Sequence, residues 1–347
     1  EDFFSNDNLR ASRVFYSEGT NFDDKYTAQN MLNAGYVSFY MPLTSKLNAT
    51  IGFRGEYNQQ SLQSRERGGG QKVDVDNRIF SPMPSLNANY KLNDKHMLRL
   101  GYGSTVNRPE FRELAPFTYY DFIFDVSRRG NKDIKVANIH NFDLRYDFYP
   151  SPGELITIGA FYKKFINPIE AAIFYNGSTV AFTVANSESA TSSGIELEVR
   201  KNLTKNFMVL FNASVIKSNV VVSGLSDFNR YLQGQSPYLI NAGLFYNLPE
   251  TGIQANILYN IIGPRIYVIG DNVLSSNVFE MPRNVLDFNL LKTFGKIEIK
   301  AGVQDLLNQP FQLRQDTNRD NKITDSDGVF QEFKRGSTYY FSVNFKF

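Results

Sequence analysis

The chain has 347 residues, with 37 basic and 35 acidic side chains that leave a net charge of +2, and it has no cysteine. This near balance gives no electrostatic argument for nucleic-acid binding, and without cysteine neither disulfides nor thiolate metal sites can form. No run of about 18 apolar residues occurs, so the sequence contains no candidate transmembrane helix.

The N-terminal segment begins EDFFSNDNLRASR, which has neither a basic start nor an apolar stretch. The sequence therefore predicts no signal peptide at this point. From about residue 30 onward, apolar and polar residues alternate with a period of two, which is typical of β-strands whose two faces meet different surroundings. Clear examples are KLNATIGFRGEY (46–57), NFDLRYDFY (141–149), GIELEVR (194–200), KIEIKAGVQ (296–304) and the C-terminal STYYFSVNFKF (337–347).

Similar segments lie near residues 30–43, 84–92, 97–104, 155–165, 206–216, 237–248, 252–262 and 284–292. Together they predict about 13 strands and no convincing helix. Short links alternate with long polar or irregular stretches. The short links are PLTSK, KLNDKH, YPSPGE, RKNLTKN, NLPETG and TFGK, and the long stretches are 58–80, 105–136, 170–190, 218–236, 264–282 and 312–332.

This alternation predicts an all-β fold, a transmembrane antiparallel β-barrel with tight periplasmic turns and long external loops. The apolar faces should contact lipid, and the charged faces should line a hydrated lumen, because so many charges do not suit a dry core. The expected lumen residues are Arg54, Glu56, Arg99, Asp143, Arg145, Asp147, Glu196, Glu198, Arg200, Asp287 and Lys300.

The direction of the last strand places residues 1–26 in an external loop. Single-chain bacterial barrels have even strand numbers, so about 13 strands suggest the C-terminal part of a larger barrel, and a 22-stranded one fits the parity. Residues 1–347 are then one barrel portion without a plug domain.

Three segments carry a family resemblance: RPEFRELAPFTYYDF (108–122), GNKDIKVANIHNFDLRYDFYPSPGELITIGAFYKKFINPIE (130–170) and SGIELEVRKNL (193–203). They resemble TonB-dependent outer-membrane receptors of the Bacteroidetes type, which often carry an N-terminal carboxypeptidase-regulatory-like domain. The closing GSTYYFSVNFKF is similar to the family's last strand, whose terminal aromatic residue, here Phe347, is read by the barrel-assembly machinery. The resemblance implies a 22-stranded barrel, a plug, and energy supplied by a TonB complex acting through that plug.

An external stretch, DTNRDNKITDSDG (316–328), has the spacing of an EF-hand-like loop. Oxygen ligands at positions 1, 3, 5, 7, 9 and 12 can wrap one Ca²⁺. The residues at these positions are Asp316, Asn318, Asp320, Lys322 (through its carbonyl), Thr324 and Asp327. Asn321 and Asp327 replace the usual Gly and Glu, so a structural calcium site and a solvated acidic loop both remain open.

Other motifs give weaker signals. RERGGGQK (65–72) lacks the Gly-Lys-Ser/Thr ending of a phosphate-binding loop and is interpreted as a loop tip. RPEFRELAPF is either a substrate-contacting lid or a structural segment that braces the barrel mouth. His96 and His140 have no paired ligands nearby in the sequence, so a zinc site is not expected. Glu196 and Glu198 share a face, but lumen lining explains them better than glycoside chemistry.

The strand pattern together with the family resemblance implies a non-enzymatic outer-membrane receptor of a Gram-negative cell that binds a nutrient with its external loops and imports it with TonB-transmitted energy. Its partners would be outer-membrane lipid, the TonB complex and, as an open question, a surface lipoprotein. Two alternatives remain: a structural or docking barrel in an outer-membrane complex, and a passive porin-like pore. A soluble β-sandwich fits the regular lipid-facing pattern poorly.

Overall fold

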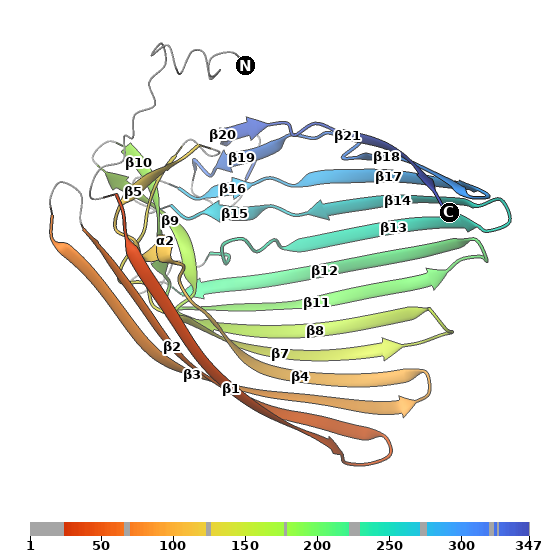
Figure 1. The fold of residues 1–347 in the computed structure, drawn as a ribbon, viewed down its shortest axis with the longest axis horizontal. Coiled ribbons are helices and arrows are strands. Elements are labelled where there is room, and N and C mark those ends of the chain that lie inside the picture. Colours follow the sequence, from red (N-terminus) through yellow and green to blue (C-terminus); the bar gives the residue numbers. More distant parts are fainter. Residues whose placement is uncertain are drawn as a thin grey trace, which may run out of the picture.

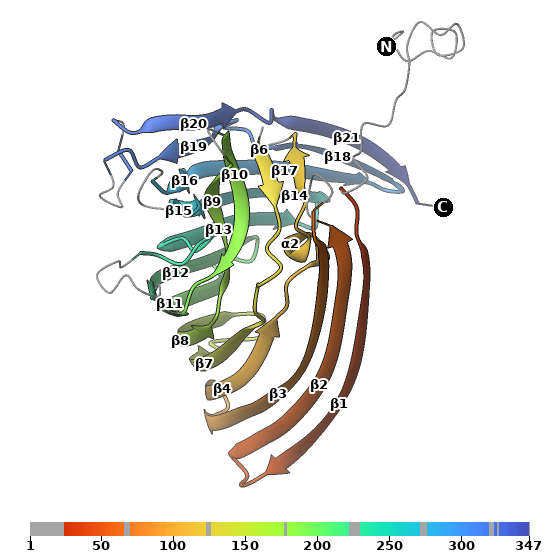
Figure 2. The same ribbon diagram turned by 90° about the vertical axis from the view of Figure 1, so that its left-hand side faces the viewer.

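The computed structural model describes residues 24–65, 70–122, 126–176, 179–221, 230–270, 276–318, 323–324 and 326–346. Within these ranges, no helix has the length and apolar character needed to cross a membrane. One antiparallel sheet dominates, and its strands follow one another in the order of the chain, with the short strands of the loops left out. Its curvature gives the molecule the shape of an open half barrel (Figures 1 and 2).

The sheet has 13 strands, which confirms the number expected from the alternating pattern. They are β1 (Thr27–Pro42), β2 (Leu47–Arg65), β3 (Lys72–Asn93), β4 (His96–Asn107), β7 (Ala137–Phe148), β8 (Leu155–Ile166), β11 (Ser189–Asn202), β12 (Phe207–Val221), β13 (Tyr238–Leu248), β14 (Ile253–Ile262), β17 (Arg283–Phe294), β18 (Ile297–Gln304) and β21 (Thr338–Phe345). Among the described strands, β1 and β21 each pair with one neighbour in this sheet and form its two edges.

The short links all turn at one end of the sheet, the end at which β21 finishes (Figure 1). Two of these turns share a local cause. The Thr44 hydroxyl accepts hydrogen bonds from the backbone amides of Lys46 and Leu47 at 3.2 and 3.0 Å. In the same way, the Thr204 hydroxyl accepts hydrogen bonds from the backbone amides of Asn206 and Phe207 at 3.2 and 3.1 Å. A threonine in each Leu-Thr link therefore closes the turn with its own side chain.

The outer face of the sheet is apolar and exposed. Leu100, Leu144, Ala160, Ile195 and Val215 lie opposite one another on five successive strands. The four large side chains of this row are 48–68% exposed, far more than core residues of a soluble protein. An apolar row that remains exposed across a whole sheet is the surface that lipid would cover.

The long loops of the sequence form eight short strands at the opposite end, and these eight make two four-stranded sheets. One sheet contains β5 (Thr118–Asp121), β6 (Val126–Arg129), β10 (Thr179–Asn186) and β9 (Ile169–Asn176). The other contains β15 (Arg265–Val268), β16 (Val278–Glu280), β19 (Phe311–Gln315) and β20 (Gly328–Phe333).

These two outer sheets are joined to each other. Ala172 and Ile269 form a parallel bridge, in which the Ile173 amide donates to the Ile269 carbonyl at 2.7 Å and the Ile269 amide donates to Ala171 at 3.1 Å. A shared apolar cluster, to which Phe182 and Val278 belong, packs residues of both sheets together. Both views show the small strands gathered over the same end of the main sheet (Figures 1 and 2).

The expectation that residues 58–80 form a long loop is wrong. β2 continues to Arg65 and β3 begins at Lys72, so most of this stretch is paired strand. The alternation changes face along the way: Ile51 and Phe53 point outward, whereas Leu62, Val73 and Val75 are buried on the inner face. Where β2 and β3 extend beyond the lipid, their outer face can be polar. This part of the hairpin therefore lacks the apolar outer face from which a membrane strand is recognised in the sequence.

Candidate functional site

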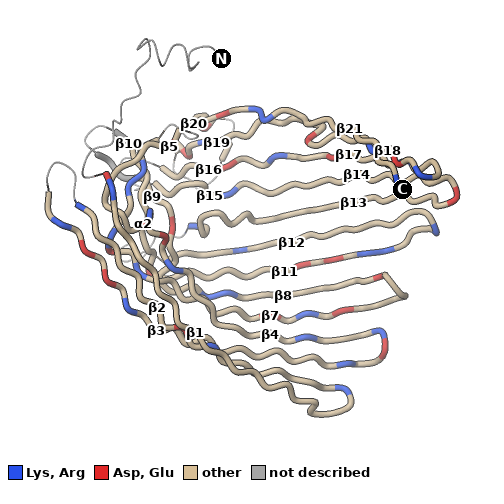
Figure 3. Tube along the Cα trace, in the orientation of Figure 1, with Lys and Arg blue, Asp and Glu red and all other residues tan. Residues whose placement is uncertain are grey.

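The inner face of the sheet carries a network of ion pairs centred on Asp147, which is fully buried. Arg99 and Arg145 each donate to this carboxylate through Nε at 2.6 Å, and the Thr157 hydroxyl donates at 2.9 Å. The expected lumen residues of β4 and β7 therefore do lie on one face and contact one another. Figure 3 shows charged residues gathered along β4, β7, β8 and β11, whereas β13 and β14 have none.

Replacing Asp147 with asparagine should lower the free energy of unfolding by about 1–3 kcal/mol, because two guanidinium groups lose charged acceptors. The midpoint of chemical unfolding in detergent measures this change. The matched control is Glu198→Gln, since Glu198 has only a 3.9 Å contact with Arg200 and should shift the midpoint little. Equal effects of the two variants would contradict the central role of Asp147.

The RPEFRELAPF segment folds back against the inner face and includes the one-turn helix α2 (Phe111–Leu114). Arg108 donates to Glu56 at 2.7 Å, and Gln60 donates to the Pro109 carbonyl at 2.9 Å. Leu114 is fully buried in a cluster with Leu62 and its neighbours. Of the two interpretations that the sequence left open, these contacts favour the bracing segment over the lid.

A second segment, residues 230–236, crosses the outer end of the inner face, and we call it the strap. Arg230 and Glu170 are only 3% and 4% exposed and form a bidentate ion pair, with N–O distances of 2.8 and 2.6 Å. Arg230 also donates to the Ser187 hydroxyl at 3.0 Å, and the Gln233 amide donates to Glu170 at 3.0 Å. This buried pair fixes the strap to β9.

The strap also connects the two outer sheets. The Gln233 side chain accepts a hydrogen bond from the Ala171 amide of β9 and donates one to the Tyr267 carbonyl of β15, both at 2.5 Å. The Gly234 amide donates to Ile266 of β15 at 2.9 Å. The strap therefore holds both outer sheets and the main sheet in one arrangement.

The strap should loosen in acid. Burial raises the pKa of the Glu170 carboxyl, but the hydrogen bonds and charge of Arg230 outweigh this, so the pKa lies below its ordinary value. A lowered pKa means that the stabilisation is complete above the unfolded-state value of about 4.3 and is lost as the pH falls through the lower folded-state value. In the wild type, the protection of the strap amides from exchange should therefore decrease as the pH is lowered from about 4.3 through the folded-state pKa of Glu170. In Glu170→Gln, protection should be low at both ends of this pH range.

The candidate calcium loop lies partly within the described residues. Asp316 and Asp327 are 1% and 4% exposed. The Asp327 carboxylate accepts hydrogen bonds from the amides of Thr317 and Thr324 at 3.1 and 2.8 Å, and the Thr324 hydrogen bonds lead the effects that lower its pKa. The predicted ligands Asp320 and Lys322 lie outside the described residues. In the described part of the chain, no group of three or more Asp, Glu, His or Cys side chains is arranged to hold a metal.

Calcium binding at Asp316, Asn318, Asp320, Lys322, Thr324 and Asp327 stays a prediction. Extracellular calcium modules have dissociation constants of about 0.1–1 mM, so 10 mM Ca²⁺ should add about 1.4–2.7 kcal/mol of local stability. Protection of residues 312–332 from protease should then rise with Ca²⁺, but not with Mg²⁺. Asp316→Asn should remove this effect, and Asp94→Asn, at a short turn, should keep it. Equal protection in Asp316→Asn would count against the site.

The remaining sequence motifs have simple positions. His96 contacts the Tyr146 hydroxyl through Nδ1 at 2.5 Å, and His140 contacts Tyr102 at 3.1 Å, so each histidine has a tyrosine partner. The tip of RERGGGQK and the terminal Phe347 lie outside the described residues. Sequence reasoning missed Glu170, Arg230 and Gln233, because Glu170 lies about 60 residues before the other two and all three fall in stretches interpreted as loops.

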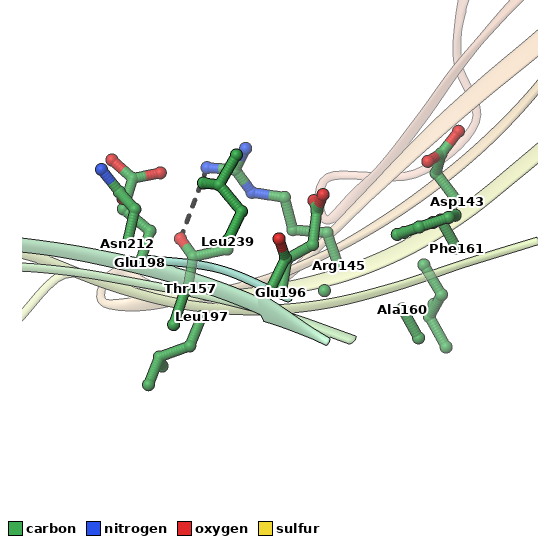
Figure 4. Close-up of a pocket in the computed structure, with 14 residues that line it drawn as sticks. Asp143, Arg145, Thr157, Ala160, Phe161, Glu196, Leu197, Glu198, Asn212 and Leu239 are labelled. Carbon is green, nitrogen blue, oxygen red and sulfur yellow. Dashed lines mark hydrogen bonds between the residues drawn. The ribbon is translucent and has the colours of Figure 1, made fainter. Parts of the chain in front are cut away.

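Two contiguous cavities lie on the inner face of β7, β8, β11 and β12. The first, about 450 Å³, extends along the wall, and the second, about 550 Å³, reaches beneath the strap. Asp143, Phe161 and Glu196 line both. Figure 4 shows Glu196, Glu198 and Arg145 rising from one side of the sheet, whereas Leu197 points to the opposite side. We call this pair of cavities the wall trench.

Comparison with known proteins gives a family and a set of similar folds. The family described as "Outer membrane protein beta-barrel family" matches residues 2–346. No curated protein sequence matches the chain. Among solved structures, the ferric yersiniabactin uptake receptor FyuA from Yersinia pestis has a TM-score of 0.67 at 16% identity, over 93% of this chain and 46% of that one.

Two further structures show the same likeness. The copper transporter OprC has a TM-score of 0.67 at 15% identity, over 92% of this chain and 50% of its own. A mutant of the ferric enterobactin receptor PfeA from Pseudomonas aeruginosa has a TM-score of 0.57 at 15% identity, over 92% and 54%. The chain thus spans about half the length of these structures, and at such identities the likeness concerns the fold.

Proposed function

Because this chain belongs to the outer membrane protein beta-barrel family, we propose that residues 1–347 are the C-terminal barrel portion of a TonB-dependent receptor. The protein is a multi-stranded barrel protein of the outer membrane. The observation that carries the proposal is the 13-stranded sheet itself, with an exposed apolar outer face and a charged inner wall. Such a wall suits a lumen filled with water or with a polar plug.

In this proposal, the receptor is of the Bacteroidetes type and the complete barrel has 22 strands, with further strands joining at β1 and β21. A plug, outside residues 1–347, fills the lumen and contacts the TonB complex. The external end binds a scarce nutrient, and energised movement of the plug opens a path along the inner wall. The chain performs no catalysis, and Phe347 serves as the signal for the barrel-assembly machinery. A surface lipoprotein is a candidate partner, and a structural calcium ion is a candidate ligand.

The proposal is tested by following which compounds cells remove from their medium. Wild-type cells, cells lacking this gene and cells lacking TonB are grown in the same rich medium, and the spent media are compared by mass spectrometry. A receptor predicts at least one compound whose removal requires both genes. Removal that needs this gene but not TonB would support a passive pore instead, and steady conductance in planar bilayers would agree with that outcome. An unchanged medium, together with loss of a surface protein complex, would support a docking barrel.

A further inference from the structure

The wall trench lies near the centre of the 13-stranded sheet. Four strands, β1 to β4, lie on one side of β7, and five, β13 to β21 in sheet order, lie on the other side of β12. Its walls therefore do not depend on what pairs with the two sheet edges. The strap roofs its outer end, with Leu232, Gln233 and Gln235 facing the cavity beneath.

The trench presents charges at three levels set by strand register. Lys163 of β8 lies opposite Ser192, at the outer level. Two residues further inward, Asp143 lies opposite Phe161, and two residues further again, Glu196 lies opposite Gly159. At about 3.3 Å per residue, the Lys163 level is about 7 Å from the Asp143 level and about 13 Å from the Glu196 level.

These three charges have no ion-pair partner among the described residues, unlike most charges of the inner wall. Arg145, which lies at the level of Glu196, directs its guanidinium to Asp147 and Thr157 instead. The Lys163 ammonium lies 5.9 Å from the centre of the Phe161 ring. Within the described residues, the trench therefore presents a cation at its outer end and two carboxylates further in that no other protein charge neutralises.

The strap is fixed at several points and sets the outer limit of the site. The strap is held by the buried Arg230–Glu170 pair and by the two Gln233 hydrogen bonds, and the Ser192 hydroxyl donates to Gln235 at 2.6 Å. A ligand that reaches Lys163 must fit beneath this roof. The cavity volumes match those of pockets that bind small molecules, not folded proteins.

We infer that the wall trench binds a short zwitterionic peptide of two to four residues. This inference rests on the proposed receptor function and names the class of its ligand. The N-terminal ammonium contacts Asp143 or Glu196, and the C-terminal carboxylate contacts Lys163. An extended peptide spans at most 3.3–3.6 Å per residue, so about two residues reach from Lys163 to Asp143 and about four reach from Lys163 to Glu196. A neutral sugar would leave all three charges desolvated without a counter-charge, which is costly.

Calorimetry with the full-length receptor in detergent tests this inference. The probes are triglycine, N-acetyl-triglycine amide, which has the same backbone without terminal charges, and maltotriose. Triglycine should bind, and the two neutral probes should bind at least tenfold more weakly or not at all. Binding of maltotriose or of the capped peptide as tight as that of triglycine would overturn the assignment.

Three variants connect the binding to the trench. Lys163→Met, Asp143→Asn and Glu196→Gln should each weaken triglycine binding, the first through the carboxylate and the other two through the ammonium. Esterified triglycine should be insensitive to Lys163→Met, because it has no carboxylate to lose. The matched control is Asp94→Asn, whose carboxylate is 95% exposed at a short turn and pairs with Lys91. Unchanged binding in all three trench variants would overturn the site.

The two proposals fail in different ways. If the three trench variants lower the melting temperature but leave triglycine binding unchanged, the trench charges pair with another part of the protein and the peptide assignment is wrong. If triglycine does not bind while TonB-dependent removal of another compound persists, the receptor function holds and only its ligand class is wrong. If triglycine binds but no compound is removed in a TonB-dependent way, the site exists and the transport proposal fails.

Discussion

Replacing Arg230 with methionine should release the strap from the outer sheets while leaving the membrane strands intact. The variant removes both bonds to Glu170 and the bond to Ser187, and it leaves a carboxylate buried without its counter-charge. Breaking one partner of a buried ion pair typically costs about 3–5 kcal/mol. Since each 1.4 kcal/mol is a factor of ten, amides of residues 230–236 should exchange with solvent roughly 100- to 4,000-fold faster.

Hydrogen exchange measured by mass spectrometry gives the readout. Peptides covering the strap and residues 169–173 should lose protection, whereas peptides of β11 and β12 near Ile195 should keep theirs. A double variant, Glu170→Gln with Arg230→Met, provides the control, because it removes the buried charge together with its partner and should recover part of the lost protection. Loss of protection that spreads evenly over the main sheet would show that the strap is not a separate unit.

The proposed peptide site should also depend on the strap. Because Gln233 and Gln235 roof the trench, a released strap should weaken triglycine binding even though Arg230 does not line the cavity. A strap that is released without any loss of binding would mean that the wall alone forms the site. Gln233 of the strap is hydrogen-bonded to both outer sheets, so release of the strap would also change how these sheets are arranged over the trench.

The sequence predicted the main sheet well because lipid imposes a simple rule on it. Every second residue must be apolar as long as the strand faces hydrocarbon, so segments such as GIELEVR reveal both the strand and its outward face. The rule ends where the lipid ends. In β2 and β3, Leu62, Val73 and Val75 are apolar on the inner face instead, since they pack against the segment that contains α2. When the apolar residues of a strand change from the outer to the inner face, the period of two is interrupted, and the segment is therefore interpreted as a loop from its sequence.

The site was harder to predict for a related reason. Asp147 and Glu196 could be assigned to the lumen from alternation alone. Nothing local distinguishes the Asp147 carboxylate, which accepts hydrogen bonds from three side chains, from the Glu196 carboxylate, which has no ion-pair partner among the described residues. That difference depends on Arg99 and Thr157, which reach Asp147 from neighbouring strands. The pairing of Glu170 with Arg230 spans 60 residues and two loops. Period-two patterns carry no information on such contacts.

Replacing Ile195 with arginine should lower the free energy of unfolding in a lipid bilayer by about 2–4 kcal/mol. Ile195 is 63% exposed on the outer face of β11, between Ala160 and Val215 of the neighbouring strands. A cation there would lie in hydrocarbon, where arginine on a barrel's lipid face costs this much near the midplane and less toward the interfaces. Chemical unfolding of the full-length protein folded into vesicles measures the change.

The matched control is Ser214→Arg, on the neighbouring strand β12, at the position that lies opposite Glu196. This residue lines the wall trench together with Glu196, so its arginine would face a hydrated lumen and a carboxylate, and the free energy of unfolding should change little. Both variants add the same charged side chain, at positions one residue apart in the strand register. Comparing them therefore separates the effect of the sheet face from the effect of the added charge. If Ser214→Arg were the more damaging variant, the assignment of the two faces would be reversed. Equal, small effects of both variants would mean that the outer face of β11 does not contact lipid at all.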